Sequence, residues 1–317
     1  DLMNNKKITH KIEEKSFVDN DIEKSITLNK IEEDLNMDGV RVLERNEILS
    51  FEPSCKFQSA LYVPQAGVVD YKVVSEMIAK KFLSLGGTIK YFQKIKTINT
   101  ENNLKVLTSD KETFKSEFLI NCAGLFSDTV AELDNIKPDL RIIPFRGEYY
   151  VLSQEKAHLV NNMIYPISDP NLPFLGIHLT KTVDGQIEAG PNAVLAFAKE
   201  GYKWSNINVS EFMKTISYKG MWKLGKQYLG TGVSEMYRSL NKRVFLKEIL
   251  NYIPDVRLSD LKPRVAGVRA QAVSSNGDLI DDFVFADGNN SLHVLNAPSP
   301  AATASLAIGE YIAAKVS

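Results

Sequence analysis

Three side chains of this 317-residue sequence are the first candidates for chemistry, because of their type and their surroundings. Arg146 and Arg269 each stand among apolar or small residues, where a charge must be paired or must bind a ligand. A guanidinium matches a carboxylate with two parallel hydrogen bonds and keeps its charge, so an acidic small molecule is a natural ligand. His178 lies between Ile177 and Leu179 in an expected strand, and imidazole readily takes up a proton near neutral pH.

A structural role is open for each of these residues at this point. Arg146 could form an ion pair with the nearby Glu148, and a single histidine on a strand is more often structural than catalytic. His293, in a second expected strand, is the next candidate for a base, whereas His10 and His158 stand in polar segments. No set of His, Cys, Asp and Glu residues has the spacing of metal ligands, so we expect no metal site.

Two stretches share a strand–turn–helix design that could position a ligand. Phe118–Asp128 (FLINCAGLFSD) ends a buried strand and passes through three small residues into a helix. In the second copy, the strand Leu292–Leu295 leads through Ser299, a good N-cap, and Pro300 into a helix expected over Ala301–Val316. Small side chains allow a flat molecule to approach the backbone, and a helix N-terminus directs partial positive charge toward it.

FLINCAGLFSD and NAPSPAATASLAIGEYIA together resemble the FAD-dependent D-amino-acid-oxidase-like superfamily, and within it the L-2-hydroxyglutarate oxidase (dehydrogenase) family. Four further stretches fit that family in its order: ALYVPQAGVVDYKVV (60–74), PFRGEYYVL (144–152), PFLGIHLTKTVDGQIEAGPNAVLAFAKEGY (173–202) and AGVRAQAVSSNGDLIDDFVF (266–285). The resemblance runs from about residue 22 to the C-terminus. Several long motifs in one order are a stronger signal than a single short pattern.

The resemblance implies oxidation of the C2 hydroxyl of L-2-hydroxyglutarate to the ketone of 2-oxoglutarate, with hydride transfer to FAD. It also implies that Arg269 and Arg146 bind the dianionic substrate and that His178 is the base. The residues expected to line the flavin are Ala123, Gly124, Ser299, Pro300, Ala301 and Ala302. Related FAD enzymes that oxidise amino acids or glycerol 3-phosphate are the alternative within the superfamily.

The family begins with a strand, a Gly-rich turn and a helix that hold the pyrophosphate, and the sequence has no Gly-x-Gly-x-x-Gly pattern. We therefore expect an N-terminally incomplete family member without its first βαβ unit. The alternative hypothesis is a cofactor-free, inactive fragment, because phosphate binding supplies much of the affinity for a dinucleotide.

The expected fold is α/β (α+β), with an incomplete FAD-binding Rossmann-like domain and a mixed-sheet substrate domain covered by helices. Segments 61–137 and 264–317 would form the FAD-binding domain, and segments 1–60 and 138–263 the substrate domain. The expected elements include a helix that Asp70 caps, a helix over 22–35, and strands over Thr88–Phe92, Ile95–Thr100, Leu104–Thr108 and Thr113–Ile120. Residues 1–20 show weak periodicity, and we expect them to be poorly ordered or a remnant.

The composition, with 44% hydrophobic and 24% charged residues, is that of a globular protein. No apolar run approaches the roughly 20 residues that span a bilayer. The sequence has only two cysteines, which favours a reducing compartment and hence the cytoplasm. Cys122 stands among small apolar residues, and we expect it to serve packing.

Charge is unevenly distributed along the chain. The net charge is −1, but residues 199–264 hold 13 Lys and Arg against 6 Asp and Glu, an excess of +7 that leaves −8 for the rest. This excess, with Trp204 and Trp222, suggests peripheral contact with an anionic membrane, where a quinone could accept electrons in place of oxygen. Solvated helix faces explain the excess equally well, and no nucleic-acid partner is expected.

Overall fold

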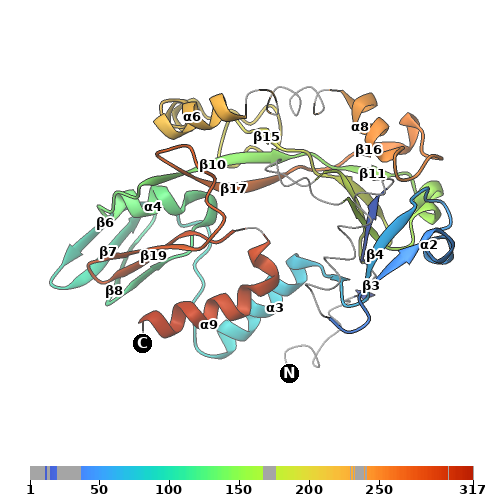
Figure 1. Cartoon of the computed structure of the whole chain (residues 1–317). Coiled ribbons are helices and arrows are strands. Elements are labelled where there is room, and N and C mark those ends of the chain that lie inside the picture. The colour runs from blue at the N-terminus through green and yellow to red at the C-terminus, as the bar shows by residue number, and fades with distance from the viewer. Residues whose placement is uncertain are drawn as a thin grey trace. The chain divides into compact units, whose positions relative to one another are not determined.

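The structure, a computed structural model, describes residues 11–12, 15–19, 37–166, 176–228, 230, 232, 239, 241–298 and 300–316 (Figure 1). The chain divides into two compact units. Unit 1 holds the described parts of 1–84, 147–194 and 230–266, and unit 2 holds those of 85–146, 195–229 and 267–317. Compactness does not show where a flavin binds, so the assignment of 61–137 and 264–317 to FAD stays a prediction. The helix expected over 22–35 lies outside the described residues.

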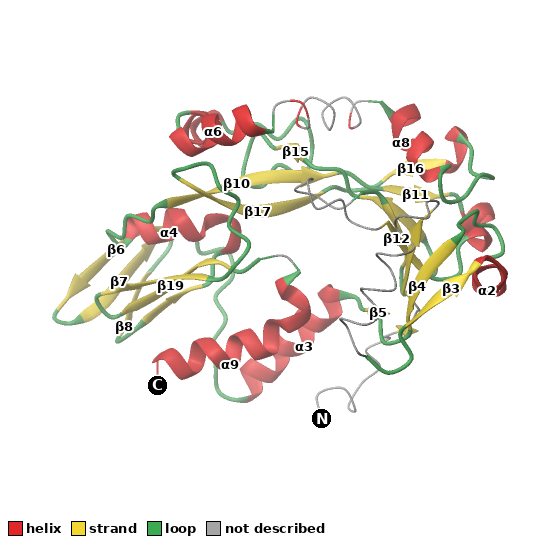
Figure 2. Ribbon diagram, in the orientation of Figure 1, coloured by secondary structure: helices red, strands yellow, loops and turns green. Residues whose placement is uncertain are grey.

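Unit 1 is built on an eight-stranded mixed sheet (Figure 2). In spatial order its strands are β16 (Leu261–Pro263), β11 (Tyr150–Leu152), β14 (Ile187–Gly190), β13 (His178–Lys181), β12 (Met163–Pro166), β2 (Lys15–Asp19), β4 (Ser59–Val63) and β3 (Arg41–Glu44). The strand β2 pairs with β12 on one side and with β4 on the other. The expectation that residues 1–20 are poorly ordered is therefore wrong for 15–19, because strand pairing rather than its own periodicity makes this segment a strand.

Two helices and the sheet enclose the core of unit 1. The helix α2 (Arg45–Phe51) buries Ile48, and α8 (Lys242–Ile249) buries Phe245 and Ile249, in one cluster with sheet residues such as Leu179. The other elements of the unit are β1 (Lys11–Ile12), β5 (Gly67–Val68), α3 (Tyr71–Ser84), η2 (Gln154–Leu159) and η3 (Leu258–Asp260). The expected cap of α3 is confirmed, because the Asp70 carboxylate accepts the Lys72 N–H at 2.8 Å.

Unit 2 contains three small sheets and the helices around them. The sheets are β6 (Ile95–Glu101), β7 (Leu104–Ser109) and β8 (Thr113–Ser116); β18 (Val284–Gly288), β19 (Ser291–Asn296) and β9 (Leu119–Asn121); and β15 (Val194–Leu195), β10 (Leu140–Gly147) and β17 (Gly267–Ser274). The helices are η1 (Gly124–Phe126), α4 (Ser127–Leu133), α5 (Val209–Ile216), α6 (Lys219–Gln227), η4 (Ala301–Ala304) and α9 (Ser305–Val316).

Two strand predictions in unit 2 need correction. Residues Thr88–Phe92 do not form a strand, because Phe92 has a φ of +58°, which no extended strand allows. The segment Thr113–Ile120 is not one strand but parts of β8 and β9. The Ser116 hydroxyl donates to the Phe118 carbonyl at 2.7 Å, and at this turn the chain passes from one sheet to the next.

The strand β10 has apolar side chains on both of its faces, and each face packs against a different layer. Ile143 packs with Leu224 of α6. Its neighbour Ile142 packs with Ala131 of α4 and Leu295 of β19. Figure 1 shows α4 close to β19, and these contacts hold α4 in the interior of unit 2.

Candidate active site

The carboxyl ends of β9 and β19 lie side by side at one edge of their sheet. The two strands are parallel, with His293 opposite Asn121. The turn Cys122–Gly124 leaves β9 at this edge, and the turn that leads to η4 leaves β19 there. The two strand–turn–helix stretches are about 170 residues apart in the sequence, and the structure brings them together. They meet at the edge where α/β sheets bind ligands.

Small residues line both turns. Of the expected flavin-lining set, Ala123, Gly124, Pro300 and Ala302 are exposed, Ala301 is half-buried, and Ser299 lies outside the described residues. Gly124 has a φ of +53°, and a Cβ added there would meet no atom within 4 Å. A flat ring can therefore approach the backbone closely, and a larger residue at this position would be both strained and in its way. These residues fit the ring system of a flavin.

The element after the second turn begins differently from the expected regular helix. Ala301–Ala304 form a single 3-10 turn, and the α-helix α9 starts only at Ser305. The Pro300 carbonyl accepts both the amide of Thr303 at 3.1 Å and its hydroxyl at 2.8 Å, which favours the tighter turn. The predicted helix start at Ala301 is thus corrected by four residues.

A buried polar chain runs beneath the Cys122–Gly124 turn. The Asp134 carboxylate accepts hydrogen bonds from Lys105 at 2.5 Å and Ser291 at 2.6 Å, and it lies 3.0 Å from Nε2 of His293. Nδ1 of His293 lies 3.0 Å from the amide nitrogen of Asn121. Burial alone would raise the pKa of Asp134, but the bonds from Lys105, Ser291 and His293 outweigh it and hold this pKa below its usual value. His293 was the second candidate for the base, but it is fully buried and hydrogen-bonded at both ring nitrogens, so it is not available to take a proton from a substrate.

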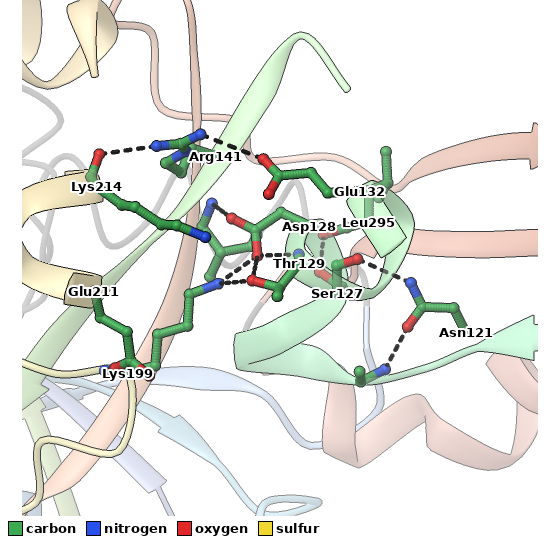
Figure 3. A network of polar contacts seen from close by, with 12 residues as sticks. Asn121, Ser127, Asp128, Thr129, Glu132, Arg141, Lys199, Glu211, Lys214 and Leu295 are labelled. Atoms are coloured by element: carbon green, nitrogen blue, oxygen red, sulfur yellow. Dashed lines mark hydrogen bonds and ion pairs between the residues drawn. The ribbon is translucent and has the colours of Figure 1, made fainter. Parts of the chain in front are cut away.

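A second buried network anchors α4 on its other side (Figure 3). The Asp128 carboxylate accepts the Ile142 N–H at 3.0 Å and pairs with the ammonium of Lys199. That ammonium also donates to the Thr129 hydroxyl at 3.1 Å, and the Lys199 N–H donates to Glu211 at 2.8 Å. The network ties α4 to β10 and to the chain before α5, and so fixes the helix that follows the small-residue turn.

The two candidate arginines have different environments within unit 2. Arg146, on β10, is 1% exposed, and its guanidinium carbon lies 3.8 Å from the ring centroid of Trp204. This is a close cation–π contact of a desolvated charge. Arg269, on β17, is exposed. The structure therefore presents Arg269 at the surface and packs Arg146 in the interior, and the substrate roles of both remain predictions.

His178 begins the strand β13 of unit 1 and is half-buried. Its ring stacks on Tyr165 of β12, with centroids 4.2 Å apart and planes at 12°. A stacked imidazole keeps its ring nitrogens at the ring edge, where they can hydrogen-bond. The arrangement suits an oriented base, and this role also stays a prediction.

Cys122 differs from its expected packing role, because the residue is exposed at the carboxyl edge of β9. Partial burial of the thiol raises its pKa, which disfavours the thiolate that a nucleophile needs. Among the residues that the structure describes, no three or more His, Cys, Asp or Glu side chains form a group suited to a metal ion. Within the same ranges, every helix is too short or too polar to cross a membrane.

The two polar networks were not predicted from the sequence, although the sequence carries a partial signal for them. Lys105 stands between Leu104 and Val106, and His293 between Leu292 and Val294. A polar residue inside an apolar strand has to find a buried partner. Which partner it finds depends on the fold and cannot be read from the neighbouring residues.

Two parallel strands that end in slim turns at one sheet edge are an arrangement in which open α/β sheets bind ligands such as dinucleotides. A sequence model of the family "FAD dependent oxidoreductase" (DAO) matches residues 16–315. The chain belongs to this FAD-dependent oxidoreductase family.

Curated relatives and solved structures agree with this membership. The chain is 48% identical over 272 residues to an L-2-hydroxyglutarate dehydrogenase of Indibacter alkaliphilus, covering 86% of this chain and 68% of the relative. It is 41% identical over 275 residues to the Escherichia coli K12 L-2-hydroxyglutarate dehydrogenase, covering 86% and 65%. The chain thus spans about two thirds of the length of these relatives. An FAD-bound L-α-glycerophosphate oxidase from Mycoplasma pneumoniae aligns with a TM-score of 0.71 at 18% identity, over 94% of this chain and 71% of that one, which shows the fold alone.

Proposed function

We propose that this chain is part of an enzyme that oxidises L-2-hydroxyglutarate to 2-oxoglutarate with FAD. The observation that supports the proposal best is the 48% identity, over 86% of the chain, to a relative named L-2-hydroxyglutarate dehydrogenase. The carboxyl edge of β9 and β19 supports it independently, because its small residues fit a flavin ring. The sequence has no Gly-rich pyrophosphate turn, so the proposal assigns only the ring end of the cofactor to these residues.

In this proposal, FAD supplies the acceptor for the hydride that leaves C2 of the substrate. Ala123 and Gly124 would line the ring from the first turn, and the residues from 299 to 302 from the second. Arg269 binds a substrate carboxylate with its fork of N–H donors, and Arg146 is the second candidate for this role. His178 takes the proton of the C2 hydroxyl at a ring nitrogen, in an orientation that Tyr165 fixes by stacking.

The test compares this chain alone with a chimera that adds the unmatched third of the Indibacter relative. We expect the purified chimera to be yellow and to form 2-oxoglutarate from L-2-hydroxyglutarate with a dye as electron acceptor. Preference for a D-amino acid or glycerol 3-phosphate would contradict the substrate. A yellow protein from this chain alone would reject the alternative of a cofactor-free fragment.

A matched pair of glycine variants tests the flavin-lining turn. Gly124 and Gly185 both have positive φ values, +53° and +82°, and an added Cβ at either one meets open space. Gly124→Val and Gly185→Val therefore carry similar backbone strain. We expect only Gly124→Val to lose flavin from the chimera, since only that side chain would occupy the place of the ring. Equal flavin content in the two variants would remove Ala123 and Gly124 from the site.

We also propose that the enzyme works at a membrane surface, which α5 and α6 contact. Val209, Met213 and Ile216 follow one another at helical spacing on α5, and the Trp222 indole N–H donates to the Ile216 carbonyl at 2.6 Å. This joins Trp222, which is 65% exposed, to an apolar stripe whose members Val209 and Met213 are 70% and 53% exposed. Residues 202–228 carry five lysines and one glutamate. An exposed tryptophan among lysines is typical of a surface that binds anionic lipid, and a membrane quinone could then accept the electrons in place of oxygen.

Vesicle flotation tests the contact. We expect binding to vesicles that contain anionic lipid, weakening as salt is added. Trp222→Ala should reduce the bound fraction severalfold, whereas Leu306→Ala should not, although Leu306 is equally exposed on α9. No binding at low salt, or an equal loss in both variants, would contradict a membrane role for α5 and α6.

A further inference from the structure

The Ala123 amide lies at the outer end of the buried polar chain beneath the proposed flavin turn. Its N–H donates to Oδ1 of Asn121 at 3.1 Å. The amide nitrogen of Asn121 donates to the Ser127 carbonyl at 2.9 Å and lies 3.0 Å from Nδ1 of His293. The exposed fractions of Asn121, Ser127 and His293 are 3%, 1% and 0%, so water does not compete for the bonds among these three residues. Figure 3 shows the side-chain nitrogen of Asn121 directed toward the Ser127 carbonyl.

The hydrogen-bond partners fix the tautomer of His293. Because Oδ1 of Asn121 already accepts the Ala123 N–H, the group that faces His293 is the NH₂ group, which can only donate. Nδ1 of His293 must therefore accept, and Nε2 must carry the hydrogen. That hydrogen points to the Asp134 carboxylate 3.0 Å away, which Lys105 and Ser291 also bind. The two N–H bonds of the Asn121 amide and the Nε2–H of His293 then each have an acceptor.

We propose that His293 is a positioning residue, which sets the conformation of the Cys122–Gly124 turn through Asn121. If Nδ1 of His293 does not accept, the amide of Asn121 loses one of its two acceptors and is free to rotate. Rotation would withdraw Oδ1 from Ala123 and release the turn. The parallel pairing of β9 with β19 makes this coupling possible, since it places Asn121 and His293 opposite each other on one face. That the turn lines a flavin rests on the proposed function, but the coupling itself does not.

Two substitutions of His293 separate positioning from simple stabilisation. In His293→Asn, the side-chain oxygen takes the place of Nδ1 and keeps an acceptor for Asn121, but Asp134 loses a donor. In His293→Gln, the side-chain nitrogen takes the place of Nε2 and keeps the donor to Asp134, but Asn121 loses its acceptor. Asparagine is smaller than glutamine, and His293→Asn leaves the buried Asp134 carboxylate short of a donor, so His293→Asn should destabilise the fold more than His293→Gln does. If His293 positions the turn, His293→Gln should release the Cys122–Gly124 turn more than His293→Asn does, which is the reverse of the order in stability.

Hydrogen exchange at the Ala123 amide measures the turn directly in the full chain. Cys122–Ala123 is the one Cys–Ala pair in the sequence, so carbonyl-¹³C cysteine with ¹⁵N alanine gives a single selected signal. We expect the Ala123 amide to exchange roughly fivefold to tenfold faster in His293→Gln than in the unchanged protein. A change of this size corresponds to the loss of about one neutral hydrogen bond. His293→Asn should stay within about twofold of the unchanged protein. A long-range ¹H–¹⁵N spectrum of the unchanged protein should show the Nε2–H tautomer.

Three results would overturn the inference: equal exchange in the two variants, faster exchange in His293→Asn only, or the Nδ1–H tautomer. None of these readings needs bound flavin, so they stand whether or not the proposed function holds. Flavin content of the chimera provides the second reading, where His293→Gln should lower FAD affinity more than His293→Asn does. If exchange follows the predicted order and FAD affinity does not, the positioning holds and the flavin role of the turn fails.

Discussion

Glu52 provides the most quantitative prediction, because it is a carboxyl group buried in unit 1. The side chain is 2% exposed at the end of α2 and accepts the N–H groups of Asn161 at 3.0 Å and Asn162 at 2.5 Å. Burial raises the pKa of Glu52 to about 7, although these donors and the nearby Lys181 act in the opposite direction. At this group, the folded protein therefore binds up to one proton more than the unfolded chain between pH 4.5 and about pH 7.

The sign and size of the effect on stability follow from this difference. The favourable contribution is fully present below the unfolded pKa of 4.5 and is lost as the pH rises through about 7. Each pKa unit corresponds to about 1.4 kcal/mol, so the free energy of unfolding should fall by roughly 2–3 kcal/mol between pH 5 and pH 8 from this residue alone. Glu52→Gln has no titrating group and should lack this part of the pH dependence.

The assay is denaturant unfolding of the unchanged chain and of Glu52→Gln at both pH values. Comparing the two proteins cancels the contributions of all other titrating groups. The structure predicts a stability difference between them that shifts by roughly 2–3 kcal/mol in favour of Glu52→Gln as the pH rises from 5 to 8. Parallel pH profiles would refute the reasoning, since they would mean that Glu52 titrates normally.

Other predictions concern unit 2. In an active chimera, Arg269→Lys keeps the charge but loses the fork, and kcat/KM should fall about tenfold to a hundredfold with little change in thermal stability. Arg146→Lys should instead lower thermal stability, because it loses the stacking on Trp204. A large stability loss in Arg269→Lys would show that Arg269 has the structural role and would leave Arg146 as the candidate for binding the substrate carboxylate. Lys105→Met should cost about 3–5 kcal/mol in denaturant unfolding, because the Asp134 carboxylate stays buried without its cation; a change near zero would show that water reaches the site. Because the pKa of Asp134 is lowered in the folded protein, its carboxylate should stabilise the fold above its usual pKa, and this stabilisation should be lost as the pH falls through the lowered pKa. The variant Asp134→Asn should lack this acid sensitivity in denaturant unfolding.

Local signals were sufficient to predict the helix at Tyr71–Ser84 and the two strand–turn–helix stretches. The Asp70 cap and the small residues after Asn121 act over a few positions, so the sequence displays them directly. The parallel pairing of β9 with β19, which places the two turns together, was not among these predictions and comes from the structure.

Long-range contacts explain what the sequence did not reveal. Asn121 and His293 are separated by 172 positions and Asp128 and Lys199 by 71, and nothing near either residue specifies its partner. The environment of Arg146 could not be predicted from its neighbours in the sequence either. Its surroundings in the sequence are compatible with an ion pair or a ligand, but the fold places it against Trp204.

Anaerobic titration of the flavin in the chimera tests the central claim most directly. Visible absorption is followed while L-2-hydroxyglutarate, D-2-hydroxyglutarate, a D-amino acid or glycerol 3-phosphate is added. We expect the L-enantiomer of 2-hydroxyglutarate to bleach the flavin band and to yield an equal amount of 2-oxoglutarate, while the other compounds leave the band unchanged. Bleaching by one of the other compounds, with no response to L-2-hydroxyglutarate, would contradict this expectation.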